Sequence, residues 1–332
     1  MKTKELIYFD NATTSLKLPS FIERLVKSHS DTSWVKDKEF YLHSLVSKLA
    51  SWLGVTREQI TLVPSSTYAI NEIFESLVVE EKIKVYLSES EHISNYASIW
   101  WLREKYPERI EFQHYNPERE WKDEQGVLLI TLRDNLGNSL WTKEKLSKLP
   151  QELVVIGDFT QSVASDDLSE IKEHFDYFYF SAHKCLGPFG LGCIVSKKPF
   201  KTIPDLDWRS IYLWEQEFET ILSFFESNKY KSKELIEYWV KNFPEDSGFS
   251  YTHYPNSLIF LVKVERHATH DFAYLLEEHN FVFRFNDLCS TNSLVSDKSL
   301  IRFSLSVLNT VEELEKLFEL MRYFEKSVKF LK

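Results

Sequence analysis

The stretch DYFYFSAHKCLGPFGLGCIVSKK, residues 176–198, decides the fold class. Two apolar runs, YFYF (177–180) and CIVS (193–196), flank the polar sequence Ser181-Ala182-His183-Lys184. Three of the chain's eight glycines, Gly187, Gly190 and Gly192, follow the lysine. Glycine allows tight turns and close approach of the backbone to a ligand. The pattern therefore predicts a strand, a lysine-containing site and a tight return into the next strand. It is not a dinucleotide-binding fingerprint, because the glycines precede a strand where a helix is needed.

Further apolar runs place this stretch in a sheet. They are ITLV (60–63), KVYL (84–87), VLLITL (127–132) and LVVIG (153–157), and helical patterns separate them. This alternation is typical of an α/β domain with a mostly parallel sheet. The polar sequences PSSTYAIN, SESEH, RDN, DFTQ and SAHK follow the strands. Loops after strands are commonly polar, but ligands of open α/β sheets bind at the carboxyl ends of strands, so together the five predict one shared site.

The pattern changes after residue 205. Residues 214–243 read as helices, SLIFLVKV (257–264) and LIRFSLS (300–306) as strands, and 309–331 as an amphipathic helix. Thr310 and Glu313 form a capping-box sequence at the start of that helix. We therefore predict a large cofactor-binding α/β domain over 15–205. A smaller α+β domain is predicted over 206–332, joined by the N-terminal segment 1–14.

Composition limits the class of protein. The net charge of −10 argues against a nucleic-acid-binding surface, which needs clustered Lys and Arg. No apolar run approaches the roughly 18 residues of a membrane span, and the N-terminus lacks a signal-peptide core. Cys185, Cys193 and Cys289 do not make a disulfide framework and fit a reducing compartment. We expect a cytoplasmic globular protein without nucleic-acid or membrane partners, and we assign no metal site.

Lys184 is the most informative single residue. A lysine at the end of a buried strand is costly unless it is paired or reacts. A lysine amine with a lowered pKa can attack a carbonyl and form a Schiff base. The residues alone leave both possibilities open.

The sequence SAHKCLGPFGLGCIVSK resembles the Ser-x-His-Lys…Gly-Pro-x-Gly-x-Gly signature of the class V aminotransferase and cysteine desulfurase family. Five other segments resemble that family in the same order: YFDNATTS (8–15), SSTYAIN (65–71), SESEHISN (88–95), GDFTQSV (157–163) and IRFSLSVLNTVEELEKL (301–317). The resemblance implies the α/β fold of fold-type I pyridoxal-phosphate enzymes, with a sheet of the seven-stranded type. It also implies pyridoxal 5'-phosphate as cofactor and a homodimer.

The resemblance gives roles to the residues around the cofactor ring. Lys184 would hold the cofactor and then move the Cα proton of the substrate. Asp158 would pair with the ring nitrogen, although it could simply cap the segment that follows. Gln161 would contact the ring hydroxyl. His92 would stack on the ring, or be an ordinary surface histidine. Asn135 could be a second partner of the ring hydroxyl, unless Asp134 takes its place.

The resemblance also implies phosphate contacts. Ser66 and Thr67 begin a helix whose N–H groups and positive dipole end suit a phosphate, and ordinary N-capping is compatible with this. Ser181 and His183 would be further contacts. Thr220 resembles a threonine that reaches the phosphate of the neighbouring subunit. Two family residues of the loop, a glycine and a glutamate, are Ser65 and Tyr68 here.

Asn11 and Arg302 would bind the substrate. Arg302 resembles the arginine whose guanidinium holds the substrate carboxylate in a bidentate pair. Cys289 lies thirteen residues earlier, in the polar loop FNDLCSTNSLVSDKSLIRFS (285–304). Cysteine desulfurases carry a nucleophilic, persulfide-forming cysteine at a similar position. Cys185 and Cys193 are expected to be packing residues.

The predicted function is therefore that of a cysteine-desulfurase-like or C–S-cleaving lyase acting on an amino acid, with a possible sulfur-acceptor protein as partner. The alternatives are a class V aminotransferase or kynureninase-type lyase on an unknown amino acid, and a non-catalytic relative.

Overall fold

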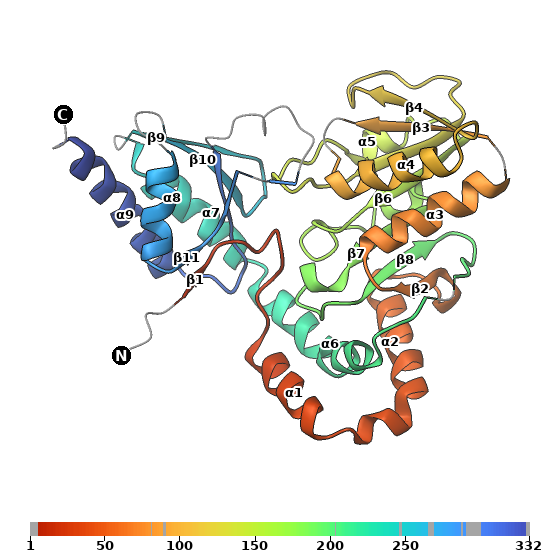
Figure 1. Ribbon diagram of the computed structural model, residues 1–332, viewed down its shortest axis with the longest axis horizontal. Coiled ribbons are helices and arrows are strands. Elements are labelled where there is room, and N and C mark those ends of the chain that lie inside the picture. Colours follow the sequence, from red (N-terminus) through yellow and green to blue (C-terminus); the bar gives the residue numbers. More distant parts are fainter. Residues whose placement is uncertain are drawn as a thin grey trace. The chain divides into compact units, whose positions relative to one another are not determined.

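The computed structural model describes residues 6–80, 82–88, 91–202, 204–245, 248–264, 269–286, 288–289 and 300–329. The chain divides into two compact units, whose elements are labelled in Figure 1. Unit 1 consists of Met1–Leu16, Asn135–Asn138 and Ser223–Lys332, and unit 2 consists of Lys17–Asp134 and Ser139–Leu222.

Unit 2 is built on a seven-stranded sheet of order β2-β8-β7-β6-β5-β3-β4. The strands are β2 (Ile60–Val63), β3 (Ile83–Ser88), β4 (Ile110–Tyr115), β5 (Gly126–Thr131), β6 (Leu153–Asp158), β7 (Tyr177–Ser181) and β8 (Gly192–Ser196). Neighbours from β7 to β4 pair in parallel, whereas β8 is antiparallel to both β7 and β2. The predicted α/β class with a mostly parallel sheet is confirmed.

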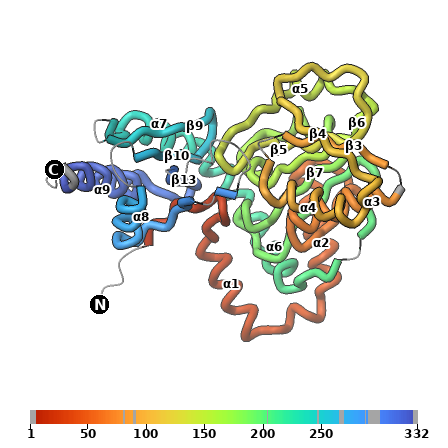
Figure 2. Tube along the Cα trace, turned by 45° about the horizontal axis from the view of Figure 1, so that its top comes forward, coloured from red at the N-terminus to blue at the C-terminus, as the bar shows by residue number. Residues whose placement is uncertain are grey.

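Helices cover both faces of this sheet. The helices of unit 2 are α1 (Pro19–Ser30), α2 (Lys38–Leu53), α3 (Ser66–Glu80), α4 (Ile93–Lys105), the short α5 (Lys143–Leu146) and the first part of α6 (Trp208–Asn228). Helix α1 contacts α6, since Ser20 and Arg24 bind Glu217. Figures 1 and 2 show α3 and α4 side by side, and their apolar residues share one core with alternate residues of the strands. On the other face, Trp52 of α2 and Trp214 of α6 contact Phe180 of β7. Because of this packing, the larger unit extends to Leu222, beyond the boundary at residue 205 that the sequence indicates.

Unit 1 contains a four-stranded antiparallel sheet and a two-stranded parallel one. The first has the order β12 (Arg284–Phe285), β13 (Leu300–Ser304), β10 (Ile259–Val264), β9 (Phe249–His253), and the second pairs β1 (Ile7–Tyr8) with β11 (Phe281–Val282). The helices are α7 (Lys231–Asn242), α8 (Thr269–Glu278) and α9 (Val311–Lys329). The predicted capping box is formed, since Thr310 N donates to Glu313 Oε2 at 2.9 Å and Glu313 N to Thr310 Oγ1 at 3.3 Å.

Among the described residues, no helix is long and apolar enough to cross a membrane. No group of three or more His, Cys, Asp or Glu side chains in that part of the chain could hold a metal ion.

Candidate functional site

The strand directions of unit 2 bring the predicted residues to one edge of the sheet. Strands β2, β3, β5, β6 and β7 point the same way, so their carboxyl ends share this edge. The reversed strand β8 begins there, with Gly192 opposite Ser181 on one side and Val63 on the other. Ser66 follows β2, Asp158 ends β6, and the short 3-10 helix Ala182–Lys184 follows β7. The prediction of one shared position for these polar residues is thus consistent with the topology.

The turn into α3 is tied to the end of β7. The backbone N–H of Ser66 donates to Ser181 Oγ at 2.9 Å, and the two hydroxyl oxygens lie 2.5 Å apart. A Cβ on Gly192 would lie 2.7 Å from Phe180 O and 3.1 Å from the Ser65 carbonyl carbon, so only glycine fits beside this turn. Ser65 Oγ accepts the Tyr68 N–H at 3.1 Å and caps the helix, which accounts for serine where the family has glycine. The arrangement fits a phosphate at the N-terminus of α3.

Positive charge gathers after β7. Lys17, which the sequence did not single out, donates from Nζ to the His183 backbone oxygen at 3.0 Å. The His183 ring stacks on Phe189 with centroids 4.9 Å apart. Burial, together with the charges of Lys184 and Lys17, lowers the pKa of His183 to about 3. Burial also lowers the pKa of Lys17 to about 8. His183 is therefore neutral at neutral pH, and the positive charges of Lys17 and Lys184 favour an anionic ligand.

Asp158 is buried at the end of β6. Its Oδ1 accepts the Thr160 N–H at 3.0 Å, and its Oδ2 accepts Asn95 Nδ2 at 3.1 Å. Asp158 therefore caps the turn that follows β6, as the alternative interpretation of this residue expects. Gln161 lies in the following turn, half-buried. The contact of either side chain with a cofactor ring stays a prediction.

His92 caps α4, which accounts for a histidine in this loop. Its Nδ1 accepts the Ser94 N–H at 3.2 Å, so the neutral ring carries its proton on Nε2. The ring is half-buried. A ring-stacking role for His92 stays a prediction, as do phosphate contacts of the exposed Thr67 and of Thr220, which is exposed in the middle of α6.

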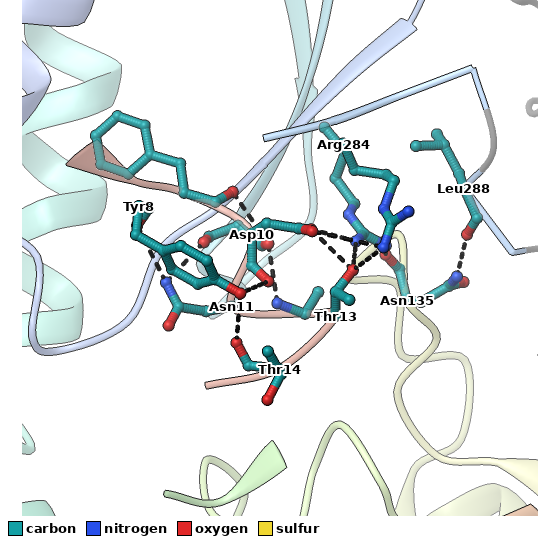
Figure 3. A network of polar contacts seen from close by, with 12 residues as sticks. Tyr8, Asp10, Asn11, Thr13, Thr14, Asn135, Arg284 and Leu288 are labelled. Atoms are coloured by element: carbon teal, nitrogen blue, oxygen red, sulfur yellow. Dashed lines mark hydrogen bonds and ion pairs between the residues drawn. The ribbon is translucent and has the colours of Figure 1, made fainter. Parts of the chain in front are cut away.

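In unit 1, Arg302 contacts Asp10 and Thr13, which Figure 3 shows in a polar network. Its Nη2 contacts Asp10 Oδ1 at 2.8 Å and Thr13 Oγ1 at 2.9 Å, and its Nη1 donates to Asn135 O at 3.1 Å. Arg302 is 2% exposed, and its buried Nε has no hydrogen-bond partner among the residues that the structure describes. A second guanidinium, that of Arg284, lies 3.6 Å from Asp10 Oδ2. Arg302 thus keeps an unused donor, which fits a further anionic ligand.

Asn11 and Asn135 also make structural contacts. Asn11 Nδ2 donates to Ser304 O at 3.1 Å, and its Oδ1 accepts the Leu16 N–H at 3.0 Å. Asn135 Nδ2 donates to Leu288 O, and within the described part of the chain the buried Asn135 Oδ1 has no hydrogen-bond partner. A substrate contact of Asn11 and a cofactor contact of Asn135 or of the buried Asp134 remain predictions.

The three cysteines differ in environment. Cys185 and Cys193 are buried, and burial raises the pKa of Cys185 to about 12 and that of Cys193 further above its ordinary range. Cys289 is half-buried, follows the Leu288 carbonyl held by Asn135, and has a left-handed backbone with φ of 51°. Residues 290–299 of its loop lie outside the described residues.

The mostly parallel seven-stranded sheet, with its polar strand ends at one edge, defines the α/β fold of fold-type I pyridoxal-phosphate enzymes. Residues 7–206 match the model of the family "Aminotransferase class-V", and the chain belongs to that family.

Individual proteins agree with this assignment. A "Probable cysteine desulfurase" of Mycoplasma genitalium is 23% identical, over 98% of this chain and 93% of that protein. One of Pasteurella multocida is 20% identical, over 94% and 87%. Among solved structures, the cysteine desulfurase of Thermococcus onnurineus NA1 in its apo form has a TM-score of 0.78 at 17% identity, covering 97% of this chain and 95% of that one.

Proposed function

We propose that this protein is a pyridoxal-phosphate-dependent enzyme that cleaves the C–S bond of an amino acid, as a cysteine desulfurase does. The proposed cofactor rests on one observation. Lys184, Asp158 and the hydrogen-bonded pair Ser66 and Ser181 all follow strands that end at the same edge of the sheet. Gly192 lets the chain pass beside that turn, because a Cβ there would meet Phe180 O and the Ser65 backbone.

Each residue would have a separate task. Ser66, Ser181 and the positive charge of Lys17 would hold the phosphate, and Asp158 would hold the protonated ring nitrogen. The cofactor, when bound, supplies an electron sink for the amino acid. Lys184 would move the proton at the substrate Cα. Arg302 would bind the substrate carboxylate with the donors that its contacts to Asp10, Thr13 and Asn135 leave unused.

Cys289 is the proposed sulfur acceptor, because the other two thiols are buried with raised pKa values. Its thiolate would attack the substrate sulfur. An S–S bond then forms as the C–S bond breaks, and the carbon keeps the electron pair and takes a proton, leaving alanine. The names of the relatives support sulfur chemistry.

The test is incubation of the purified protein, loaded with pyridoxal phosphate, with cysteine and a thiol reductant, followed by assay of sulfide and alanine. Equal amounts of both are expected. Cys289→Ser should lose sulfide release, whereas Cys193→Ala, a matched control, should keep it. Lys184→Ala should lose the absorbance of the bound cofactor. No cofactor absorbance in the wild-type protein would refute the proposal.

A class V aminotransferase is the second candidate, favoured by the family to which the chain belongs. Formation of a keto acid instead of sulfide, with conversion of the cofactor to its amine form, would select it.

We also propose a cytoplasmic homodimer, in line with the family and with the three free cysteines. The side chain of Thr220 is exposed to solvent, so it could contact a second subunit. Light scattering of the wild-type protein tests the dimer. Transfer of labelled sulfur from Cys289 to a thiol protein tests a sulfur-acceptor partner.

A further inference from the structure

A buried hydrogen-bonded network adjoins Asp158 in unit 2. Asn95 Nδ2 donates to Asp158 Oδ2 at 3.1 Å and to Glu91 Oε2 at 3.2 Å, so one amide nitrogen bridges two carboxyl groups. Asn95 Oδ1 accepts the Tyr179 hydroxyl at 2.8 Å. Glu91 and Asn95 are each 1% exposed. Because both ends of the amide are engaged, Asn95 is held in one orientation.

Glu91 receives hydrogen bonds from three elements. Ser88 Oγ of β3 donates to Oε1 at 2.9 Å, and Thr131 Oγ1 of β5 and Asn95 of α4 donate to Oε2. Burial, helped by a smaller effect of the Asp158 charge, nevertheless raises the pKa of Glu91 to about 7 against the lowering by these three donors. Desolvation outweighs hydrogen bonding because a fully buried carboxylate loses its hydration.

Two tyrosines also face this network. Burial raises the pKa of Tyr115 in β4 and of Tyr179 in β7 well above the ordinary tyrosine range, and the charge of Glu91 acts on both. Both tyrosines are therefore neutral around pH 7. Glu91 therefore titrates near neutral pH, whereas neither tyrosine loses its proton in that range.

We propose that Glu91 and Asn95 are positioning residues for Asp158. Asn95 fixes the direction of the Asp158 carboxylate, and Glu91 gains or loses a proton and so controls how strongly Asp158 holds a cation. The inference rests on the proposed function, because the cation would be the protonated ring nitrogen of pyridoxal phosphate. Ionised Glu91 adds negative charge across the Asn95 amide and favours the cation. By linkage, the bound cation favours loss of the Glu91 proton.

The first experiment does not need the cofactor. Infrared spectra of the purified apo protein are recorded at about pH 6 and about pH 8.5, on either side of the Glu91 pKa of about 7. A protonated carboxyl band should be present at the lower pH and lost at the higher one. Glu91→Gln should abolish this titrating band. Glu325→Gln, which changes a buried carboxyl of α9 in unit 1, should retain it.

The second experiment measures the Kd of pyridoxal phosphate at the same two pH values. Wild type and Glu91→Gln should bind alike at the lower pH. At the higher pH, Glu91→Gln should bind about tenfold more weakly, the effect of one charge at moderate distance. Thr131→Val removes a donor to Glu91 and should move both the band titration and the affinity change to higher pH. A merely structural role would not produce that shift.

The outcomes separate this inference from the proposed function. A titrating band that persists in Glu91→Gln, or an affinity ratio that is the same at both pH values, would overturn the role of Glu91. A wild-type protein that binds no pyridoxal phosphate would instead overturn the proposed function and, with it, the control of a cofactor cation. The infrared titration would then still decide whether Glu91 is the buried acid.

Discussion

The ion pair between Asp10 and Arg302 should be a main contributor to the stability of unit 1. The atoms lie 2.8 Å apart, and the side chains are only 9% and 3% exposed. Asp10→Asn keeps the shape but leaves Arg302 buried without a carboxylate, and Arg284 close by. Removing one partner of a buried pair costs about 3–5 kcal/mol. We expect a loss near the lower limit, about 3 kcal/mol, because Asn can still accept a hydrogen bond.

Urea unfolding of the apo protein, followed by tryptophan fluorescence, measures this loss. With a denaturant slope of about 2 kcal/mol per molar, the midpoint should fall by about 1.5 M. The matched control is Glu144→Gln, which breaks the exposed Lys148–Glu144 pair and should leave the midpoint unchanged. A loss below about 1 kcal/mol in Asp10→Asn would refute the reasoning, since it would mean that the pair is screened like a surface pair.

A second test of the charge is the double variant Asp10→Asn with Arg302→Met. Replacing both partners of a buried pair is often close to neutral, so the double variant should be more stable than Asp10→Asn alone. Additive losses would contradict a direct interaction.

Three other predictions concern unit 2 and the thiols. Gly192→Ala should destabilise the apo protein by about 1–3 kcal/mol through overpacking and weaken pyridoxal phosphate binding, as measured by urea unfolding and absorbance titration. At about pH 8, a thiol reagent should modify Cys289 rapidly in the native protein, whereas Cys185 and Cys193 should react only after unfolding, which mass spectrometry of the labelled peptides checks. Lys17 has its pKa lowered from 10.5 to about 8, so the unfolded chain binds the proton more tightly. Wild-type stability relative to Lys17→Met should therefore rise from pH 8 to pH 10.5, as measured by urea unfolding across that range.

Most of the sheet could be predicted from the sequence because buried parallel strands read as short apolar runs. ITLV coincides with β2, Ile60–Val63, and the other five runs fall on strands within one or two residues. Strand β4, Ile110–Tyr115, does not stand out as an apolar run. Its sequence IEFQHY is half polar, because it pairs only with β3 at the sheet edge and exposes several side chains.

The candidate site could be predicted only where it follows strands. Asp158 and Lys184 are found that way, since each comes directly after an apolar run. Lys17 contacts a residue 166 positions away, and Asp10 pairs with one 292 positions away, so no local pattern shows either contact. The raised pKa of Glu91 arises from its complete burial, and burial cannot be recognised from the residue type alone.

The pairing of the N-terminal segment has a consequence for biosynthesis. Phe9 and Asn11 exchange backbone hydrogen bonds with Ser304, and β1 pairs with β11, so unit 1 is assembled from segments that leave the ribosome far apart in time. Unit 2 is complete once residue 222 has been made. Vectorial synthesis therefore favours folding of the lysine-bearing unit first, while residues 7–11 stay unpaired until strands β11 and β13 have been translated.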